Sequence, residues 1–159
     1  MILFILLLFI HPVTSENVTE TSEKWDKFFF HTSISCDFDH KPNFTYDIMF
    51  YEFDSWEAGA DDVMSEWFEN EPILAKGITN QTYPAKMNGD GDRGLFYEPY
   101  AYIQHNCLPS EKPVKVSIYF WPHECRIGTG DCHFYVNIDL TGLEGHEKRE
   151  VRIEQGETH

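Results

Sequence analysis

Four cysteines and the histidines near them are the residues of this chain suited to cross-linking it or holding a metal. The cysteines are Cys36, Cys107, Cys125 and Cys132. A zinc site that combined some of them with His123 and His133 would not match the ligand spacing of the usual zinc fingers. An even number of cysteines in a short chain instead predicts two disulfides. We therefore expect two disulfide bonds, no metal and no cofactor.

The spacing of the cysteines favours one of the three possible pairings. Cys125 and Cys132 flank a short polar loop that contains Gly128 and Gly130, and these glycines let the chain double back. This favours a bond between Cys125 and Cys132, which leaves Cys36 for Cys107. In the chain-entropy account the long loop contributes about 4 kcal/mol to stability and the short one about 2.5 kcal/mol.

Motifs of common enzymes and of calcium loops are absent or incomplete. The sequence has no Gly-X-Ser-X-Gly and no His-Glu-X-X-His. Asn88, Asp90 and Asp92 alternate as calcium ligands do. However, Arg93 and Pro99 occupy the positions where an EF-hand loop has glycine and glutamate. We expect a solvated turn here and no catalytic residues.

Three histidines, His105, His123 and His133, lie on or beside expected strands. Strands bring distant residues together, but spacing alone does not show whether these three meet. His105 stands two residues before Cys107, so we expect its role to be structural, orienting or covering that cysteine.

An acidic segment from Trp56 to Leu74 contains three large aromatic side chains, Trp56, Trp67 and Phe68. Large apolar groups in such a segment either close over the core as a lid or form an exposed contact patch. We favour the lid, and the contact patch remains the alternative.

The N-terminus predicts secretion. Residues 2–10 form an apolar run that is followed by small residues, which suits cleavage after Ser15. The run is about half the length of a membrane-spanning helix, which needs about 20 residues. We expect a signal peptide over residues 1–15 and one secreted domain over residues 16–159. Asparagines in glycosylation sequons, which we expect at the surface, are Asn17, Asn43 and Asn80.

The composition describes a folded, strongly acidic chain. Apolar residues make up 42% and aromatic residues 16% of the sequence, which is typical of a globular domain. Twelve basic residues against 27 acidic ones give a formal charge of −15. Such a charge repels nucleic acid and anionic lipid alike. We expect no nucleic acid partner and no membrane span.

Short stretches of alternating apolar and polar residues predict an all-β fold. Pro122 and several glycine-rich turns separate these stretches. The pattern indicates an antiparallel two-sheet β-sandwich of seven to eight strands with at most one short helix, near residues 62–67. The expected strands cover residues 27–36, 46–54, 73–79, 83–87, 97–106, 114–120, 133–140 and 150–154.

Several of these pieces together resemble the nematode transthyretin-like family. The most specific part is His105-Asn106-Cys107 at the end of the stretch 102–107. The order and spacing of the other pieces also match: residues 34–36, 41–42, 50–55, 61–66 and 112–118. The resemblance covers roughly residues 28–140. It implies a transthyretin-type sandwich in which Cys36 and Cys107 form the shared bond. The chain departs from the family pattern at residues 80–84 and in an apparent insertion at residues 67–74.

The resemblance also raises one enzymatic alternative. Transthyretin-related hydroxyisourate hydrolases end in a Tyr-Arg-Gly-Ser signature, whereas this chain ends in Gln155-Gly156-Glu157-Thr158-His159. We therefore expect a non-enzymatic extracellular protein that binds a small hydrophobic ligand, a lipid or a cell-surface protein. A secreted hydrolase of that type is the alternative, and a cluster of histidine and arginine at a pocket would favour it.

Overall fold

The computed structural model describes residues 25–39, 41–54, 60–89, 94–110, 112–122 and 125–156. The expected signal peptide, Asn17 and Asp90 to Arg93 lie outside the described residues. The strands are β1 (Asp26–Ser35), β2 (Asn43–Phe44), β3 (Tyr46–Glu52), β4 (Asp62–Val63), β5 (Phe68–Glu69), β6 (Ile73–Leu74), β7 (Ile78–Met87), β8 (Pro99–His105), β9 (Val114–Trp121), β10 (Asp131–Asp139), β11 (Gly145–Glu150) and β12 (Arg152–Gln155).

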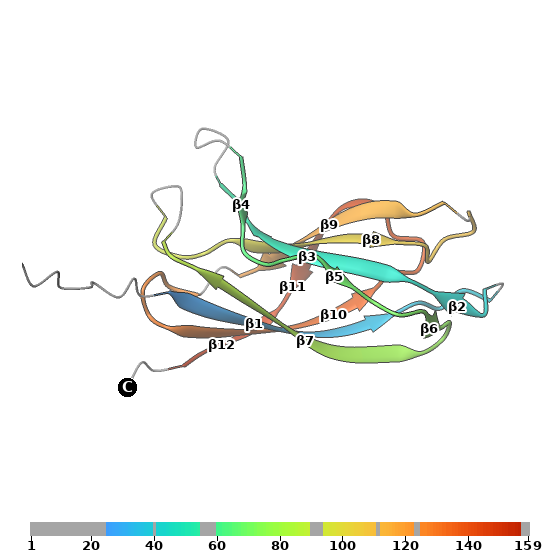
Figure 1. Ribbon diagram of the computed structural model, residues 1–159, viewed down its shortest axis with the longest axis horizontal. Coiled ribbons are helices and arrows are strands. Elements are labelled where there is room, and N and C mark those ends of the chain that lie inside the picture. Colours follow the sequence, from blue (N-terminus) through green and yellow to red (C-terminus); the bar gives the residue numbers. More distant parts are fainter. Residues whose placement is uncertain are drawn as a thin grey trace, which may run out of the picture.

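Two sheets lie face to face as the layers of a sandwich (Figure 1). The four-stranded sheet has the order β12-β10-β1-β7, and the six-stranded sheet has the order β11-β9-β8-β3-β4, with β5 also paired to β3. Strands β2 and β6 form a small separate ribbon. Most neighbours are antiparallel, as predicted, but β1 and β10 run parallel, and so do β9 and β11.

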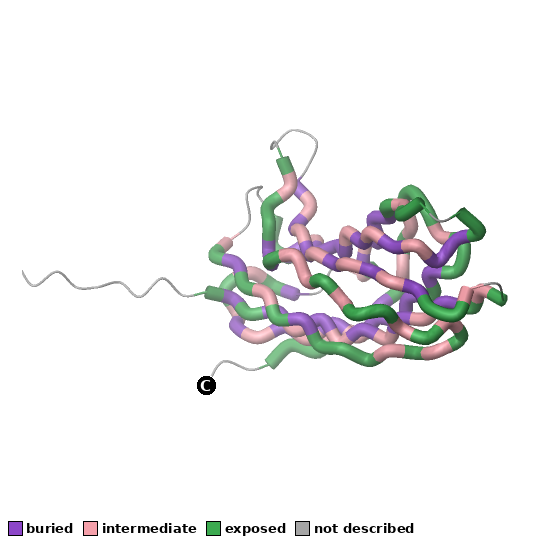
Figure 2. The backbone as a smooth tube through the Cα atoms, turned by 45° about the vertical axis from the view of Figure 1, so that its right-hand side comes forward, coloured by how far each residue is buried: buried purple, intermediate pink, exposed green. Residues whose placement is uncertain are grey.

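Alternation along the strands directs apolar side chains between the sheets (Figure 2). The run of three phenylalanines left the inward face of β1 ambiguous in the sequence. In the structure Phe28 and Phe30 are fully buried, while Phe29 lies on the opposite face. Phe30 stacks on Phe50 from the other sheet, with ring centroids 3.9 Å apart. Burying side chains of this size contributes roughly 1.5–3 kcal/mol each.

Three local predictions are wrong. No helical turn forms near residues 62–67. This stretch instead begins with β4 and leads into β5, and both of these strands pair with β3. The two strands expected at residues 73–79 and 83–87 become β6 and one continuous β7. Pro84 does not interrupt β7, because this strand is the edge of its sheet and is not required to donate a second row of hydrogen bonds.

The third error is β11, which the sequence did not indicate. Its six residues contain no apolar side chain, so no period of two is visible. The strand forms because its backbone pairs with β9 over the register from Gly145 to Glu150.

Both disulfides form, and the pairs are the ones favoured by the sequence. Cys36 bonds Cys107 across 71 residues, and Cys125 bonds Cys132 across seven. All four are fully buried. Gly128 and Gly130 in the short loop have φ values of 78° and 107°, so their left-handed backbone explains why glycines occupy the turn.

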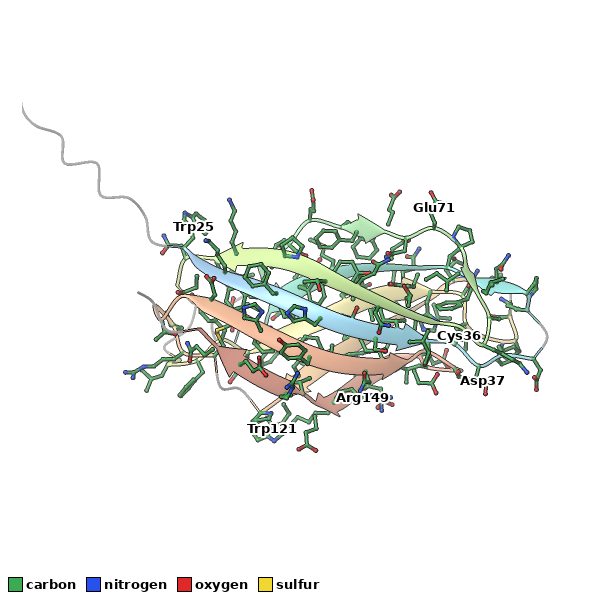
Figure 3. All side chains as sticks on the ribbon, turned by 90° about the horizontal axis from the view of Figure 1, so that it is seen from below. Trp25, Cys36, Asp37, Glu71, Trp121 and Arg149 are labelled. Carbon is green, nitrogen blue, oxygen red and sulfur yellow. A yellow bond between two sulfur atoms is a disulfide. The ribbon has the colours of Figure 1, made fainter. Side chains whose placement is uncertain are left out.

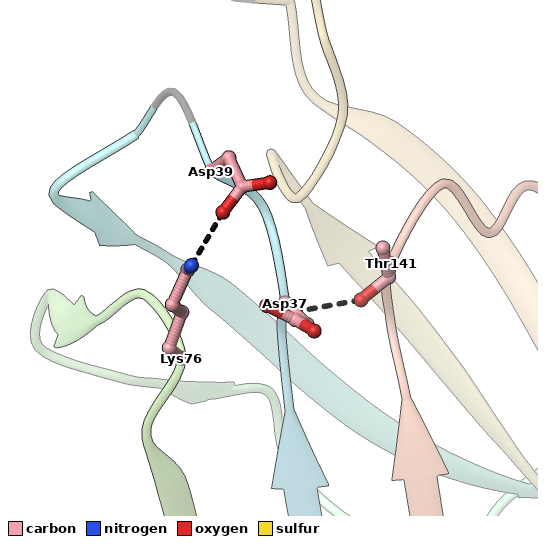
Figure 4. Close-up of polar contacts among 4 residues, drawn as sticks. All are labelled: Asp37, Asp39, Lys76 and Thr141. Atoms are coloured by element: carbon pink, nitrogen blue, oxygen red, sulfur yellow. Dashed lines mark hydrogen bonds and ion pairs between the residues drawn. The ribbon is translucent and has the colours of Figure 1, made fainter.

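Polar contacts surround the segment that follows the end of β1 (Figure 4). The Asp37 backbone N–H donates to the Thr141 hydroxyl at 2.7 Å, and Lys76 pairs with Asp39. The Lys76 backbone N–H donates to the Cys36 carbonyl at 2.7 Å. The long-range disulfide therefore lies where β1, the segment before β7 and the turn after β10 meet.

Candidate functional site

A groove crosses the outer face of the four-stranded sheet. Figure 3 views this face, with β7, β1 and β10 side by side and Cys36 at the far end of β1 from Trp25. The groove has a volume of about 960 Å³. Its lining is mainly polar and includes His31, Ser33, Asn80, Thr82, Tyr135 and Asn137. This is a surface for hydrogen bonding rather than for burying an apolar molecule.

Two histidines are joined at the edge of this groove. His31 Nε2 lies 2.9 Å from His133 Nδ1, and the two rings are within 7° of coplanar. His31 Nδ1 lies 2.9 Å from the Thr82 hydroxyl. Phe29 stacks on His133 at 4.7 Å and Tyr135 stacks on His31 at 4.5 Å. The parallel pairing of β1 with β10 places each of these stacked pairs in direct register.

The paired arrangement limits how many protons the two rings hold. Burial, and then the neighbouring His133, lower the pKa of His31. One proton fits between Nε2 of His31 and Nδ1 of His133, because one nitrogen donates it and the other accepts it. If both rings were imidazolium, two N–H donors and two positive charges would face each other. Arg152 lies over Tyr135 at 4.1 Å and pairs with Glu154 at 2.9 Å, so an arginine also adjoins the groove.

The three histidines considered in the sequence do not form one site. His133 lies on the outer face of the four-stranded sheet, and His105 is buried in β8 of the other sheet. His123 lies outside the described residues. His31, which does join His133, was not considered, because the β1 and β10 register that brings it there is not readable from spacing.

His105 has the structural role that was predicted. Its Nδ1 accepts a hydrogen bond from the Cys107 backbone N–H at 3.1 Å, and its Nε2 donates to the Leu143 carbonyl at 2.8 Å. These partners require the neutral ring with its proton on Nε2. Protonating Nδ1 would turn its donor toward the N–H of Cys107.

This geometry predicts that acidification destabilises the fold. Burial lowers the pKa of His105 below its ordinary value of 6.5, so the unfolded chain takes up the proton first as the pH falls. Stability should therefore decrease below about pH 6.5, by at most about 1.4 kcal/mol per pH unit for this group. Urea unfolding of the wild type and of His105→Gln between pH 7.5 and 5 measures the slope. The variant should be less stable but less pH-dependent, and exposed His146→Gln should keep the wild-type slope. An unchanged slope in His105→Gln would contradict this role.

The outer face of the six-stranded sheet carries a second feature, a continuous set of aromatic rings. We call it the aromatic face, and it consists of Tyr51, Phe53, Trp67, Tyr100, Tyr102 and Tyr119. Tyr100 stacks on Tyr119 at 4.8 Å and on Tyr51 at 5.4 Å. Trp67 lies 6.0 Å from Tyr102. Strands β3, β8 and β9 contribute the tyrosines.

Strand alternation explains why these rings lie on the outer face of the sheet, where Tyr100 is buried and the other five are half-buried. In β3 and β8 the buried residues Phe50 and Ala101 face each other, so their neighbours Tyr51 and Tyr102 point outward. The signal that could have identified the face is the recurrence of tyrosine, rather than serine or lysine, at outward positions of adjacent strands.

Charged groups border the aromatic face. The Tyr100 hydroxyl donates to the Asp61 carboxylate at 2.7 Å, and burial together with Asp61 raises the pKa of Tyr100. Lys115 lies over the Tyr102 ring at 5.6 Å. The rings are therefore held in place by polar neighbours, which leaves a pre-organised surface of amphipathic side chains.

The segment from Trp56 to Leu74 combines both of the expected roles. Phe68 lies 5.0 Å from Tyr83 and packs against the core, as a lid would. Trp67, the preceding residue, points instead to the aromatic face, as a contact patch would. Trp56 lies outside the described residues.

The described segments contain no group of three or more His, Cys, Asp or Glu residues placed to hold a metal ion. No helix able to cross a membrane occurs in the part of the chain that the structure describes. Fold and surfaces together define a disulfide-bonded, all-β sandwich with a polar groove on one sheet and an aromatic face on the other. No family model, no curated protein and no solved structure matches this chain.

Proposed function

We propose that this protein is a secreted, non-enzymatic interaction protein that binds a partner protein through the aromatic face. The continuous set of tyrosines with Trp67 carries the proposal. Tyrosine and tryptophan supply large, rigid contact areas with a polar end, and they are enriched where proteins bind one another. An extracellular or cell-surface protein fits this surface better than a small hydrophobic ligand does.

Two observations support the extracellular location and the fold type in this proposal. Two buried disulfides are compatible with an oxidising compartment outside the cell. The bond between Cys36 and Cys107 is the one implied by the resemblance to the transthyretin-like family, which supports a transthyretin-type sandwich.

The groove on the other sheet does not favour a hydrophobic ligand, because its polar lining would lose hydrogen bonds to water on binding one.

Tyrosine variants on the two faces test the proposal. Labelled protein should bind the surface of cultured animal cells, and Tyr102→Ser should weaken binding at least tenfold, which corresponds to about 1.4 kcal/mol. Tyr135→Ser is the matched control, because Tyr135 is equally half-buried but lies on the other sheet. Equal binding by the two variants, or stronger loss in Tyr135→Ser, would contradict the proposal. Flow cytometry measures both variants on the same cells.

A second candidate function has one observation in its favour. His31 and Arg152 line the groove, and His133 bonds His31 beside them. This is the cluster of histidine and arginine at a pocket that favours a hydrolase of the hydroxyisourate type. We place it second because Arg152 is paired with Glu154.

An activity assay separates the two functions. We expect the purified protein not to accelerate hydroxyisourate hydrolysis, measured by absorbance against the uncatalysed rate. Turnover that disappears in His31→Ala and His133→Ala but persists in His146→Ala would make the groove an active site and replace the interaction proposal for that surface.

A further inference from the structure

Asn80 occupies an unusual position for a glycosylation sequon. It is the third residue of the ten-residue edge strand β7, is exposed, and stands opposite Ser33 of β1 in the register. Its side chain lines the groove on the outer face of the four-stranded sheet. The third residue of the same sequon, Thr82, also lines the groove, and its hydroxyl contacts His31 at 2.9 Å. A sugar chain attached to Asn80 would therefore begin inside the groove.

The chemistry of the groove suits a carbohydrate. Ser33 and Thr82 offer hydroxyls, and Asn137 offers an amide that can donate and accept hydrogen bonds. Sugar hydroxyls have the same double capacity, while the apolar face of a sugar ring can lie against an aromatic ring such as Tyr135. A volume of about 960 Å³ is at the upper end of the range for ligand pockets.

Because the glycan would be covalently attached to Asn80, weak contacts would be sufficient to hold it in the groove. A group tethered at the edge of its own binding surface is present at an effective concentration in the millimolar range. Strand β7 is also the edge strand of its sheet, and natural proteins commonly protect such edges against pairing with other chains. A glycan near the N-terminal end of β7 would provide that protection for this part of the edge.

We infer that an N-linked glycan on Asn80 lies in the groove of the four-stranded sheet, is held by hydrogen bonds to the groove lining, and shields the edge strand β7. The inference rests on the proposed secretion, because N-glycosylation requires passage through the secretory route. It is independent of the aromatic face, which lies on the other sheet. It also gives the polar groove an occupant other than a substrate.

The test uses the full chain secreted from eukaryotic cells, with Asn43 as the matched sequon. Asn43 is exposed at the start of β2 and does not line the groove. Glycopeptide mass spectrometry should find a glycan on Asn80 that is less processed than the one on Asn43. Oxidative labelling of the folded protein should increase severalfold at Tyr135, and stay constant at Tyr102, once the glycans are removed enzymatically.

Variants that each remove one sequon show which glycan protects Tyr135 from labelling. Asn80→Gln should reproduce the increase at Tyr135, whereas Asn43→Gln should leave it unchanged. Enzymatic removal after folding keeps the result interpretable if Asn80→Gln folds poorly. An unmodified Asn80 beside a modified Asn43, or constant labelling of Tyr135, would overturn this inference alone. Absence of glycan from both sites would also overturn this inference, whereas failure of the chain to leave the cells would overturn the proposed secretion.

Discussion

Replacing Asp26 by alanine should destabilise the protein by about 3 kcal/mol or more, because three donors, two of them buried, lose their acceptor. The Asp26 carboxylate accepts hydrogen bonds from the Tyr97 hydroxyl at 2.8 Å and from the backbone N–H groups of Gly128 at 2.6 Å and Gly130 at 2.9 Å. The side chain is only 2% exposed, so water cannot replace it. This single residue fixes the start of β1 against the loop closed by the short disulfide.

The asparagine variant refines this test. Asp26→Asn keeps one acceptor oxygen but turns an amide donor toward one of the three N–H or O–H groups, so we expect a smaller loss of roughly 1–3 kcal/mol. Asp62→Ala is the control, because Asp62 is exposed and a surface change of this kind stays within about 0.5 kcal/mol. Urea unfolding measures all three variants. A loss in Asp26→Ala no larger than that in Asp62→Ala would contradict the role of Asp26.

Removing the long-range disulfide should have the other large effect. Cys36→Ser with Cys107→Ser should cost about 2–5 kcal/mol, a large part of the 5–15 kcal/mol that stabilises a typical domain. This bond closes a loop of 71 residues and joins the end of β1 to the end of β8. Secretion of the double variant should fall sharply, because the unfolded chain gains the most freedom when this bond is lost.

The short disulfide provides the comparison. Cys125→Ser with Cys132→Ser opens a loop with a sequence separation of only seven, and Asp26 still holds that loop through Gly128 and Gly130. We expect secretion to persist with a lower melting temperature. Secretion yield and thermal unfolding of the two double variants check the order. Equal tolerance of both, or non-reducing peptides that link Cys36 to Cys125 or Cys132, would contradict the account.

The sequence alone predicted the strands in which apolar and outward residues alternate clearly. It failed where pairing with a neighbouring strand decides whether a segment becomes a strand. Strand β3 was predicted well, because Ile48 and Phe50 alternate with polar or aromatic outward residues. β11 was missed, because the hydrogen bonds of β9 stabilise a segment without apolar side chains. The helical turn was wrong because pairing with β3 outweighed the local preference of an acidic segment.

The candidate surfaces were harder to predict than the core. Joining His31 to His133 depends on the parallel register of β1 and β10, and their separation of 102 residues carries no such information. The aromatic face needs three strands in the correct order before its tyrosines become neighbours. Trp67 and Phe68 show the same limit: Trp67, just before β5, contacts Tyr102 of the aromatic face, whereas Phe68, the first residue of β5, contacts Tyr83.

Site-specific photocrosslinking tests the proposed interaction surface most directly. A photoreactive phenylalanine analogue would replace Tyr102 on the aromatic face in one protein and Tyr135 on the opposite sheet in another. After binding to cells and illumination, the probe at position 102 should form a discrete crosslinked product with a partner protein, and unlabelled wild-type protein should compete for it. Crosslinking from position 135 with none from position 102 would contradict binding through the aromatic face.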